Sequence, residues 1–319
     1  MALDQEAKKF TLEAYAPSTR QTYNTHRRTY LLFCEKLGYC PVPATTDVLI
    51  KYTVFLARSL TFSSIKQYLN IIHTLHREWD LPNPLDNNFH LTSLLRGIRR
   101  SLGDTVKQKA PITPELLKAI LSRLNLADPM DACVWAVALI LFFGLLRKAS
   151  ILPNKAFIRT DHRGLSRSDV KFYSWGMCLL IRHTKTIQFK QRTLEIPISR
   201  MPNNVLCPVQ ATFQAFRATP CIPGNFPAFC VPSAKGIHAI TGQQFVLRIK
   251  QCLHLCGKTS KMYAGHSFRR GGATWAYRIG LPAEIIRTMG DWKSSAYLGY
   301  IDIDTKTVRS AITLMQSQV

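Results

Sequence analysis

Apolar residues in the first hundred positions recur at helical spacing. They repeat three and four positions apart after Pro17, after Thr46 and around Ile65, and a fourth stretch leads to Arg100. This spacing places them on one face of an α-helix and leaves polar and basic residues on the other. No strand-like alternation interrupts the block, so we predict a compact bundle of four or five helices. The positions that we expect to face inward are Tyr23, Tyr30, Leu31, Cys34, Leu49, Tyr52, Phe55, Leu56, Ile65, Tyr68, Leu69 and Ile72.

Further along the chain, two stretches alternate between apolar and other residues, as half-buried β-strands do. The alternating apolar positions are Trp175, Met177, Leu179 and Ile181, then Leu194, Ile196 and Ile198. The basic residues 183–190 lie between them and predict a hairpin tip. Helices are expected before the hairpin, over 115–124 and 132–146, and after it from Pro208, except for a loop over 220–232. The predicted fold class is therefore mainly α with a small antiparallel β-sheet.

A polar segment separates the helical block from the rest of the chain. Residues 105–114 read TVKQKAPITP, in which two prolines flank a threonine that is suited to capping a helix. We therefore predict a domain over 1–104, a linker over 105–114 and a second domain over 115–319. The apolar run 132–146 is shorter than the roughly 18 residues that a membrane span needs, so it predicts a buried helix and no membrane partner.

The charge of the chain is strongly basic. Its 319 residues carry 42 Lys and Arg against 19 Asp and Glu, a formal net charge of +23. Such an excess suits a surface that binds phosphates, because each neutralised phosphate releases counterions. Composition alone leaves DNA, RNA and membrane-surface partners open. The nine cysteines contain no CxxC pair, and we expect neither a metal nor a disulfide framework.

Four short segments of the second domain carry candidate chemistry. They read FFGLLRKASILP, RHTKTIQ, GHSFRRGG and GDWKSSAYLGYID. Each contains residue types that act on phosphates or exchange protons, and His-x-x-Arg places two of them on one helical face. In chain order the candidate catalytic residues are Arg147, Lys185, His266, Arg269, Trp292 and Tyr300.

That order and its flanking residues resemble the tyrosine recombinases, the integrase family that includes the Cre and Xer enzymes. The residues of these segments are most similar to those of the recombinases of eukaryotic Crypton and DIRS-type mobile elements. The resemblance covers the second domain closely, where it implies a catalytic domain of the DNA breaking-rejoining fold. It covers residues 1–104 more loosely, where it implies a SAM-like core-binding domain. It further implies a two-domain clamp on double-stranded DNA, a homotetramer, a nuclear location, and neither a cofactor nor a small-molecule substrate.

The resemblance also implies a role for each candidate residue, and elementary chemistry supports those roles. Two arginines, Arg147 and Arg269, suit nonbridging phosphate oxygens because each offers planar, permanently charged donors. A tyrosine with an ordinary pKa of about 10 needs a proton acceptor, for which His266 is suited. Lys185 would protonate the departing 5′-oxygen as a general acid, and Trp292 would donate its indole N–H to the phosphate. Tyr300 would become the 3′-phosphotyrosyl link.

Each of these residues also has an ordinary structural interpretation. Arg147 follows an apolar helix and would there stabilise the helix dipole. Lys185 would be a solvated charge, His266 and Arg269 surface neighbours, and Trp292 and Tyr300 core aromatics. Taken together in this order, the six positions favour the catalytic interpretation.

Three features leave alternatives open at this stage. Tyr297 competes with Tyr300 as nucleophile, although Tyr300 has the spacing of the family. Ser150 stands three positions after Arg147, where many family members carry an acidic residue. The helix-compatible segment 305–315 suits docking either on its own subunit or on a neighbour.

The predicted function is a site-specific DNA recombinase or integrase, acting in integration or excision of a mobile element. Two alternatives are a domesticated DNA-binding protein that no longer cuts and a type IB topoisomerase-like enzyme. Phosphate contacts of the first domain position DNA without specifying its sequence. The residues predicted to make them are Arg20, Arg27, Arg28, Lys66, Arg99 and Arg100.

Overall fold

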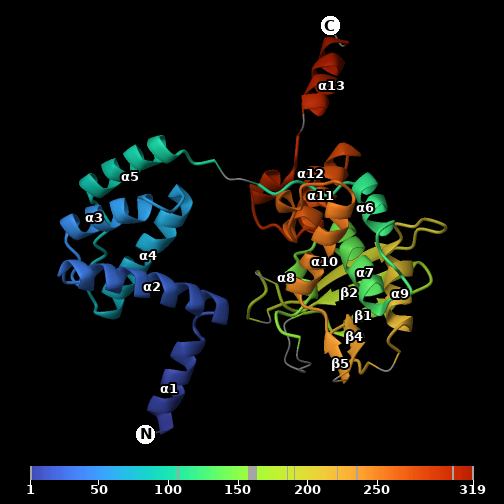
Figure 1. The fold of residues 1–319 in the computed structure, drawn as a ribbon, viewed down its shortest axis with the longest axis horizontal. Coiled ribbons are helices and arrows are strands. Elements are labelled where there is room, and N and C mark those ends of the chain that lie inside the picture. The colour runs from blue at the N-terminus through green and yellow to red at the C-terminus, as the bar shows by residue number, and fades with distance from the viewer. Residues whose placement is uncertain are drawn as a thin grey trace. The chain divides into compact units, whose positions relative to one another are not determined.

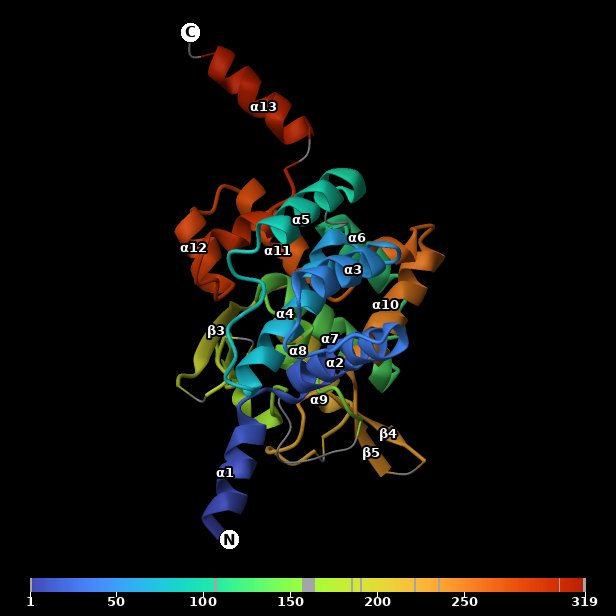
Figure 2. The same ribbon diagram turned by 90° about the vertical axis from the view of Figure 1, so that its left-hand side faces the viewer.

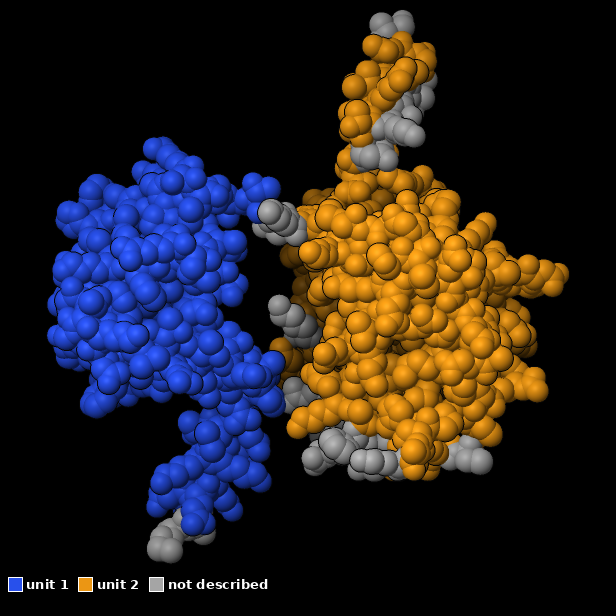
Figure 3. Space-filling view, in the orientation of Figure 1, with its two compact units in different colours: residues 1–107 blue, residues 108–319 orange. Residues whose placement is uncertain are grey.

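The computed structural model of the chain divides into two compact units, residues 1–107 and residues 108–319 (Figure 3). It describes residues 2–105, 108–156, 164–184, 186–189, 191–220, 222–234, 236–303 and 305–317. Each unit encloses a hydrophobic cluster of its own. No helix in the part of the chain so described is long and apolar enough to cross a lipid bilayer.

Unit 1, residues 1–107, is built from helices alone. They are α1 (Ala2–Glu13), α2 (Pro17–Leu37), α3 (Thr46–Ala57), α4 (Phe62–Glu78) and α5 (Phe89–Leu102) (Figure 1). Side-chain caps begin two of them: Thr45 accepts a hydrogen bond from the backbone N–H of Val48, and Asn88 accepts one from that of Leu91. The predicted helical block is confirmed by these elements.

The core of unit 1 contains most of the positions predicted to face inward. Tyr30, Leu49, Tyr52 and other members of that set are buried completely. Two expectations were wrong, because Leu31 is 38% exposed and Phe55 is 43% exposed. Leu31 follows the buried Tyr30 by about 100° around the helix, which turns it toward solvent. Phe55 lies at the edge of the α2–α3 contact, with its ring 5.3 Å from that of Phe33.

Unit 2, residues 108–319, surrounds one buried helix. Its α-helices are α6 (Pro114–Leu121), α7 (Pro129–Phe143), α8 (Lys148–Ile151), α9 (Pro208–Arg217), α10 (Gly242–Leu255), α11 (His266–Arg278), α12 (Ala283–Met289) and α13 (Thr305–Gln316). Its 3-10 helices are η1 (Arg167–Asp169), η2 (Ser260–Met262) and η3 (Ser295–Tyr300). Almost every residue of α7 is buried, because α9 and α11 pack against it. Figure 1 and Figure 2 both show α13 extending away from the rest of unit 2.

A three-stranded antiparallel sheet contains the predicted hairpin. Its strands β1 (Val170–Phe172), β2 (Gly176–Ile181) and β3 (Leu194–Ser199) follow one another in that order. The alternating positions of β2 and β3 pair across the sheet, for example Leu179 with Ile196. Trp175 was wrongly expected in a strand: it precedes β2, is 48% exposed, and stacks on Tyr173 with ring centroids 5.3 Å apart.

A second hairpin lies where only loop and helices were expected. Strand β4 (Cys230–Ser233) pairs antiparallel with β5 (Gly236–Ala239). Each strand has only four residues, and Pro232 interrupts the apolar pattern of the first, so neither gave a strand signal in the sequence. The prediction of helices alone after Pro208 is therefore wrong for this segment.

Part of the predicted linker packs against the second unit. The backbone N–H of Ile112 donates to the carbonyl of Ser267 at 2.9 Å, and the Ile112 side chain is buried. A Cβ on Gly271 would lie 1.9 Å from the carbonyl oxygen of Ile112. On the next residue, Gly272, a Cβ would lie 2.0 Å from the carbonyl oxygen of Phe142. The two glycines of the GHSFRRGG segment thus let α11 pack closely against both the incoming chain and α7.

Candidate active site

Arg269 lies buried at the centre of the predicted site. Its side chain points from α11 and is 1% exposed. One terminal nitrogen donates to the carbonyl of Leu145, and the other donates to the carbonyl of Gly290 at 2.7 Å. Leu145 and Asp291, the residue after Gly290, both have left-handed backbone, with φ of 49° and 52°. Non-glycine residues adopt this conformation at a cost, and such strain clusters at functional sites.

The charge of Arg269 is poorly compensated in this environment. Burial lowers the pKa of Arg269 to about 10, and the positive charge of Arg147 lowers it in the same direction. The nearby Tyr300 side chain acts on this pKa in the opposite direction. None of the carboxylates in the described ranges forms a salt bridge with Arg269. Two arginines that repel one another form a site for an anion such as phosphate.

Trp292 and Tyr300 lie against the guanidinium of Arg269. The Arg269 Cζ atom lies 3.8 Å from the ring centroid of Trp292 and 5.2 Å from that of Tyr300. The two aromatic rings are 5.2 Å apart. Cation–π contact of this kind holds the guanidinium plane in place. The indole Nε1 of Trp292 is buried without a hydrogen-bond partner in the described structure, as a donor reserved for a ligand would be.

Tyr297 reaches this cluster in a different way from Tyr300. The Tyr297 ring packs against Trp292 with centroids 6.3 Å apart, at the edge of the cluster formed by Leu145, Ile286 and their neighbours. The Tyr300 ring, in contrast, also contacts the guanidinium of Arg269, with its centroid 5.2 Å from the Cζ atom. The geometry therefore favours Tyr300 as the nucleophile.

Contacts with α11 hold the segment that bears Tyr300. The Thr274 hydroxyl donates to the carbonyl of Tyr300 at 3.3 Å and accepts from the backbone N–H of Asp302 at 2.9 Å. Arg270 donates to the Asp302 carboxylate at 2.6 Å. Thr274 and Arg270 were not singled out in the sequence, although Arg270 directly follows Arg269 in the GHSFRRGG segment.

Trp292 depends on the glycine two positions before it. A Cβ on Gly290 would lie 1.7 Å from the indole ring, so no side chain fits there without moving Trp292. The indole itself is 7% exposed and packs with Leu145, Ala273 and Ile286. The Gly-Asp-Trp sequence thus fixes both the carbonyl that Arg269 uses and the ring that it contacts.

The remaining predicted catalytic residues are placed as follows. Arg147 directly precedes the short helix α8, is half-buried and lies close enough to Arg269 to lower the pKa of Arg269. His266 is the first residue of α11, exposed, one turn before Arg269. Ser150 is buried, and its N–H donates to the carbonyl of Arg147. Lys185 lies outside the described residues.

The predicted DNA-binding residues lie on helices α2, α4 and α5 of unit 1. Arg27 forms an ion pair with Glu78, and Arg99 forms one with Asp104 at 2.7 Å. Lys66 lies over the Phe62 ring, as does Arg99. Arg28 and Arg100 are exposed, and Arg20 is half-buried on α2. Of these basic residues, Arg27 and Arg99 form ion pairs with acidic side chains in the described structure.

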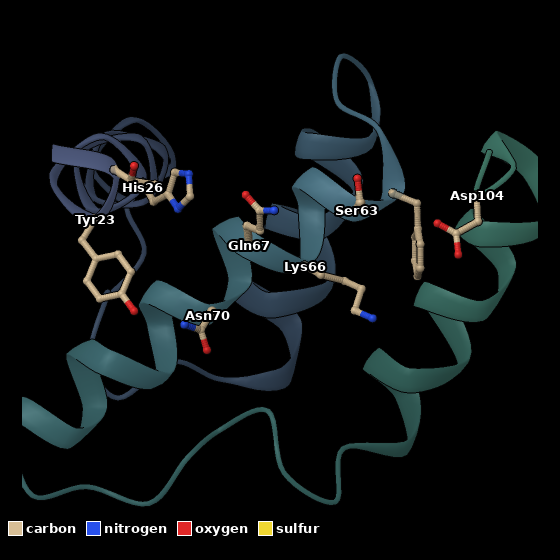
Figure 4. A pocket seen from close by; sticks show the side chains of 9 residues that line it. Tyr23, His26, Ser63, Lys66, Gln67, Asn70 and Asp104 are labelled. Carbon is tan, nitrogen blue, oxygen red and sulfur yellow. The ribbon is translucent and has the colours of Figure 1, made fainter. Parts of the chain in front are cut away.

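A hollow of about 570 Å³ lies between α2 and α4 (Figure 4). Side chains from α4 reach it from one side and side chains from α2 from the other. The α4 side chains follow helical spacing, which places them on one face; that pattern was present in the sequence but was overlooked. The residues that line the hollow are Thr22, Tyr23, His26, Phe62, Ser63, Lys66, Gln67, Asn70 and Asp104.

Comparison with known proteins identifies the fold. No protein-family model matches the chain. The structure of the Tn1549 transposon integrase, in complex with transposon right end DNA, superimposes with a TM-score of 0.62 at 16% identity, over 97% of this chain and 98% of that one. The fold is that of a tyrosine recombinase.

Sequence similarity agrees with this recombinase fold. The chain is 25% identical to an integrase/recombinase xerD homolog of Selenomonas ruminantium, over 92% of this chain and 83% of that protein. It is 24% identical to the recombinase cre of Escherichia phage P1, over 96% of this chain and 92% of that protein. The chain is therefore similar to integrases and recombinases along nearly its whole length, and the predicted fold class is confirmed.

Proposed function

We propose that the chain is a site-specific DNA recombinase that cuts and rejoins DNA through Tyr300. The observation that carries this proposal is the buried cluster of Arg269, Trp292 and Tyr300, with Arg147 beside it. It combines an anion site, a free indole donor and a nucleophile at one place in a fold shared with an integrase that binds DNA. Its relatives are named as recombinases.

In the proposed reaction, the Tyr300 oxygen attacks a phosphorus atom of the DNA backbone. A bond forms between that oxygen and phosphorus, and the bond from phosphorus to the 5′-oxygen breaks. His266 accepts the tyrosine proton, and Lys185 donates a proton to the departing 5′-oxygen. The product is a 3′-phosphotyrosyl link, which a 5′-hydroxyl attacks in the reverse sense to rejoin the strand.

Arg147 and Arg269 stabilise the charge on the nonbridging oxygens as the phosphorus becomes pentacoordinate. Donors that are already held in position in a buried site need not reorient as the charge develops, so little energy is lost. The fixed geometry of Arg269 provides such a donor. Because the phosphotyrosyl link conserves the energy of the broken bond, rejoining needs no nucleotide to drive it.

The hollow between α2 and α4 is proposed to face duplex DNA. Lys66 and the neighbouring arginines would contact phosphates, and such contacts position the duplex. Gln67 and Asn70 extend into the hollow from α4 (Figure 4). Amide side chains pair with the N6 and N7 atoms of adenine in the major groove, so this face suits base recognition.

The proposed biological role is integration or excision of a mobile element of the Crypton or DIRS kind, by a homotetramer in the nucleus. The residues of the FFGLLRKASILP and GDWKSSAYLGYID segments resemble those of Crypton and DIRS-type recombinases and support this type of element. The proposed nuclear location follows from that type. The exposed apolar side chains of α13, Val308, Ile312 and Met315, support contact with a neighbouring subunit.

The test is covalent capture of DNA. Wild type and Tyr300→Phe are incubated with nicked duplexes tiled across the DNA that flanks the gene, and adducts are resolved on a denaturing gel. A wild-type adduct that the variant lacks is the expected result. Duplex binding without any adduct would instead favour the domesticated binder, and relaxation of DNA without strand exchange would favour a topoisomerase-like enzyme.

A further inference from the structure

Asp291 joins two parts of unit 2 that lie far apart in the sequence. One carboxylate oxygen accepts from the Thr186 hydroxyl at 2.5 Å, and the other accepts from the guanidinium of Arg192. Thr186 and Arg192 lie in the loop of residues 182–193 that connects β2 to β3. The Asp291 side chain is only 11% exposed, which strengthens its bond with Thr186, whereas the Arg192 side chain is 42% exposed.

The loop is also ordered internally around its contact with Asp291. The Thr184 hydroxyl oxygen accepts from the backbone N–H groups of Thr186 and Ile187, each at 3.0 Å. The Gln191 side chain donates to the carbonyl of Thr186 at 2.9 Å, and Ile187 is buried completely. These bonds hold Thr184, Thr186, Ile187 and Gln191 to one another.

On its other side, Asp291 is part of the arginine and tryptophan cluster. It lies between Gly290, whose carbonyl accepts from Arg269, and Trp292, whose ring contacts that arginine. The left-handed backbone of Asp291, with φ of 52°, turns its carboxylate toward the loop while Gly290 faces Arg269. The negative charge of Asp291 also acts favourably on Arg269.

We propose that Asp291 is a positioning residue, which holds the loop that carries Lys185 in register with Arg269, Trp292 and Tyr300. The inference rests on the proposed function and deepens it. Ser150 occupies the position where many tyrosine recombinases have an acidic residue. In this chain a carboxylate that acts on Arg269 comes instead from Asp291, on a different segment.

A general acid such as Lys185 must be held in a fixed position to act. A proton donor acts only when it lies within hydrogen-bond reach of the leaving oxygen, and misplacement by about 1 Å costs on the order of 10²-fold in rate. A loop anchored only at its strand ends samples many conformations, each of which removes Lys185 from register. The Asp291 contacts remove that freedom and place the anchor one residue from Trp292.

The test uses a DNA substrate in which sulfur replaces the bridging 5′-oxygen at the cleavage site. A thiolate leaves without being protonated, so cleavage of this substrate does not depend on a general acid. We expect Asp291→Ala to cleave the oxygen substrate about 100-fold more slowly than wild type, and the sulfur substrate within about tenfold of wild type. Lys185→Ala is expected to show the same pattern, and Arg192→Ala a weaker one.

Asp169→Asn is the matched control. Among the described residues, Asp169 forms a second carboxylate–arginine pair in this hairpin, and its side-chain bonds go to Arg182, at 2.9 Å, rather than to the Trp292 segment. It should leave cleavage of both substrates unchanged. Thermal unfolding of each variant shows whether unit 2 stays folded, and Asp291→Asn, which keeps the shape of the side chain, provides a milder second variant.

Two results would overturn the inference. Equal slowing of both substrates by Asp291→Ala and Asp291→Asn would mean that Asp291 acts on the nucleophile or on the fold. Unchanged cleavage of both substrates would mean that the contacts are dispensable. If wild type cleaves neither substrate, the proposed function itself fails, which is distinct from either result.

Discussion

At the scale of single residues, Arg269 shows how the site is prepared for an anion. Its guanidinium is buried, bound to two carbonyl oxygens and covered by the Trp292 ring. The two carbonyls are presented by Leu145 and Gly290, each at or beside a residue with left-handed backbone. A buried cation held by neutral acceptors is costly to the free protein, and a bound phosphate oxygen would offset that cost.

Replacing Arg269 by lysine should separate charge from geometry. Lysine keeps the positive charge, but a single ammonium group cannot reach both carbonyls and also donate to phosphate. We expect Arg269→Lys to reduce the rate of covalent adduct formation by about 10²-fold or more. Arg217→Lys, at an exposed position of α9, is the control and should leave the rate unchanged. A near-normal rate in Arg269→Lys would show that the bidentate geometry is unimportant.

The order of the candidate catalytic residues can be read from the sequence, but their contacts cannot. Arg147, Arg269, Trp292 and Tyr300 were recognised from local segments and their spacing. The partners of Arg269 lie on segments that are distant in the sequence. The bond between Thr186 and Asp291 likewise spans 105 positions, so no local pattern indicates it.

At the scale of elements, one buried ion pair joins two helices of unit 2. Asp131 of α7 accepts from Arg248 of α10 at 2.6 and 2.7 Å, and from the backbone N–H of Asn125 at 2.8 Å. Burial alone would raise the pKa of Asp131, but the bonds from Arg248 and Asn125 outweigh it, and the pKa is lowered. The carboxylate therefore stabilises the folded state when it is ionised.

Asp131→Asn should lower the free energy of unfolding by about 3 kcal/mol at neutral pH, because Arg248 keeps a partly buried charge without its counter-ion. Since the folded-state pKa is below that of the unfolded chain, the contribution is present above the ordinary aspartate pKa and is lost as pH falls. Urea unfolding between about pH 7 and pH 3 should show the two proteins converging in acid. Asp47→Asn, which breaks the exposed pair with Lys51, should change stability little. A gap that stays constant with pH would contradict this account.

On the face of α4 that lines the hollow, we predict that amide side chains recognise bases and that Lys66 contacts phosphate. Gln67→Ala should change the preferred base at one position of the target site, with a cost of about 1–3 kcal/mol for that base alone. Lys66→Ala should weaken binding to all sequences and reduce the salt dependence by about one phosphate contact. Binding of a randomised duplex library at several salt concentrations distinguishes the two effects. The same uniform loss in both variants would argue against base recognition.

Element prediction succeeded where periodicity is long and failed where it is short. Helices α2, α3 and α4 have several turns of apolar spacing, and the β2–β3 hairpin has clear alternation. Strands β4 and β5 have four residues each, too few for either period to be recognised. Helix α1 has no apolar stripe that packs on the bundle, and its described side chains are all exposed.

At the scale of the whole molecule, the net charge of +23 and the two compact units agree with a protein that binds DNA over a large surface. The division between the units lies within the polar segment 105–114, while residues 109–112 are already bonded to unit 2. Composition predicted the polar segment, but only tertiary packing against Gly271 shows where it ends.

Assembly on DNA is predicted to depend on α13. Removing residues 305–319 should prevent the proposed tetramer from forming on DNA, because it deletes Val308, Ile312 and Met315, the exposed apolar side chains proposed to contact the neighbouring subunit. The monomer should still form a covalent adduct, since Arg147, Arg269 and Tyr300 remain in place. Light scattering of the DNA complexes provides the measurement. Unchanged tetramers would show that α13 packs on its own subunit.

The most direct test of the central claim is the identity of the residue that becomes linked to DNA. Wild-type protein trapped on a nicked duplex is digested with nuclease and trypsin, and the peptide of residues 294–306 is fragmented in a mass spectrometer. That peptide contains both Tyr297 and Tyr300. We predict a nucleotide linked through its phosphate to Tyr300, whose ring contacts the guanidinium of Arg269. The same mass on Tyr297, or on a residue outside this peptide, would contradict the account.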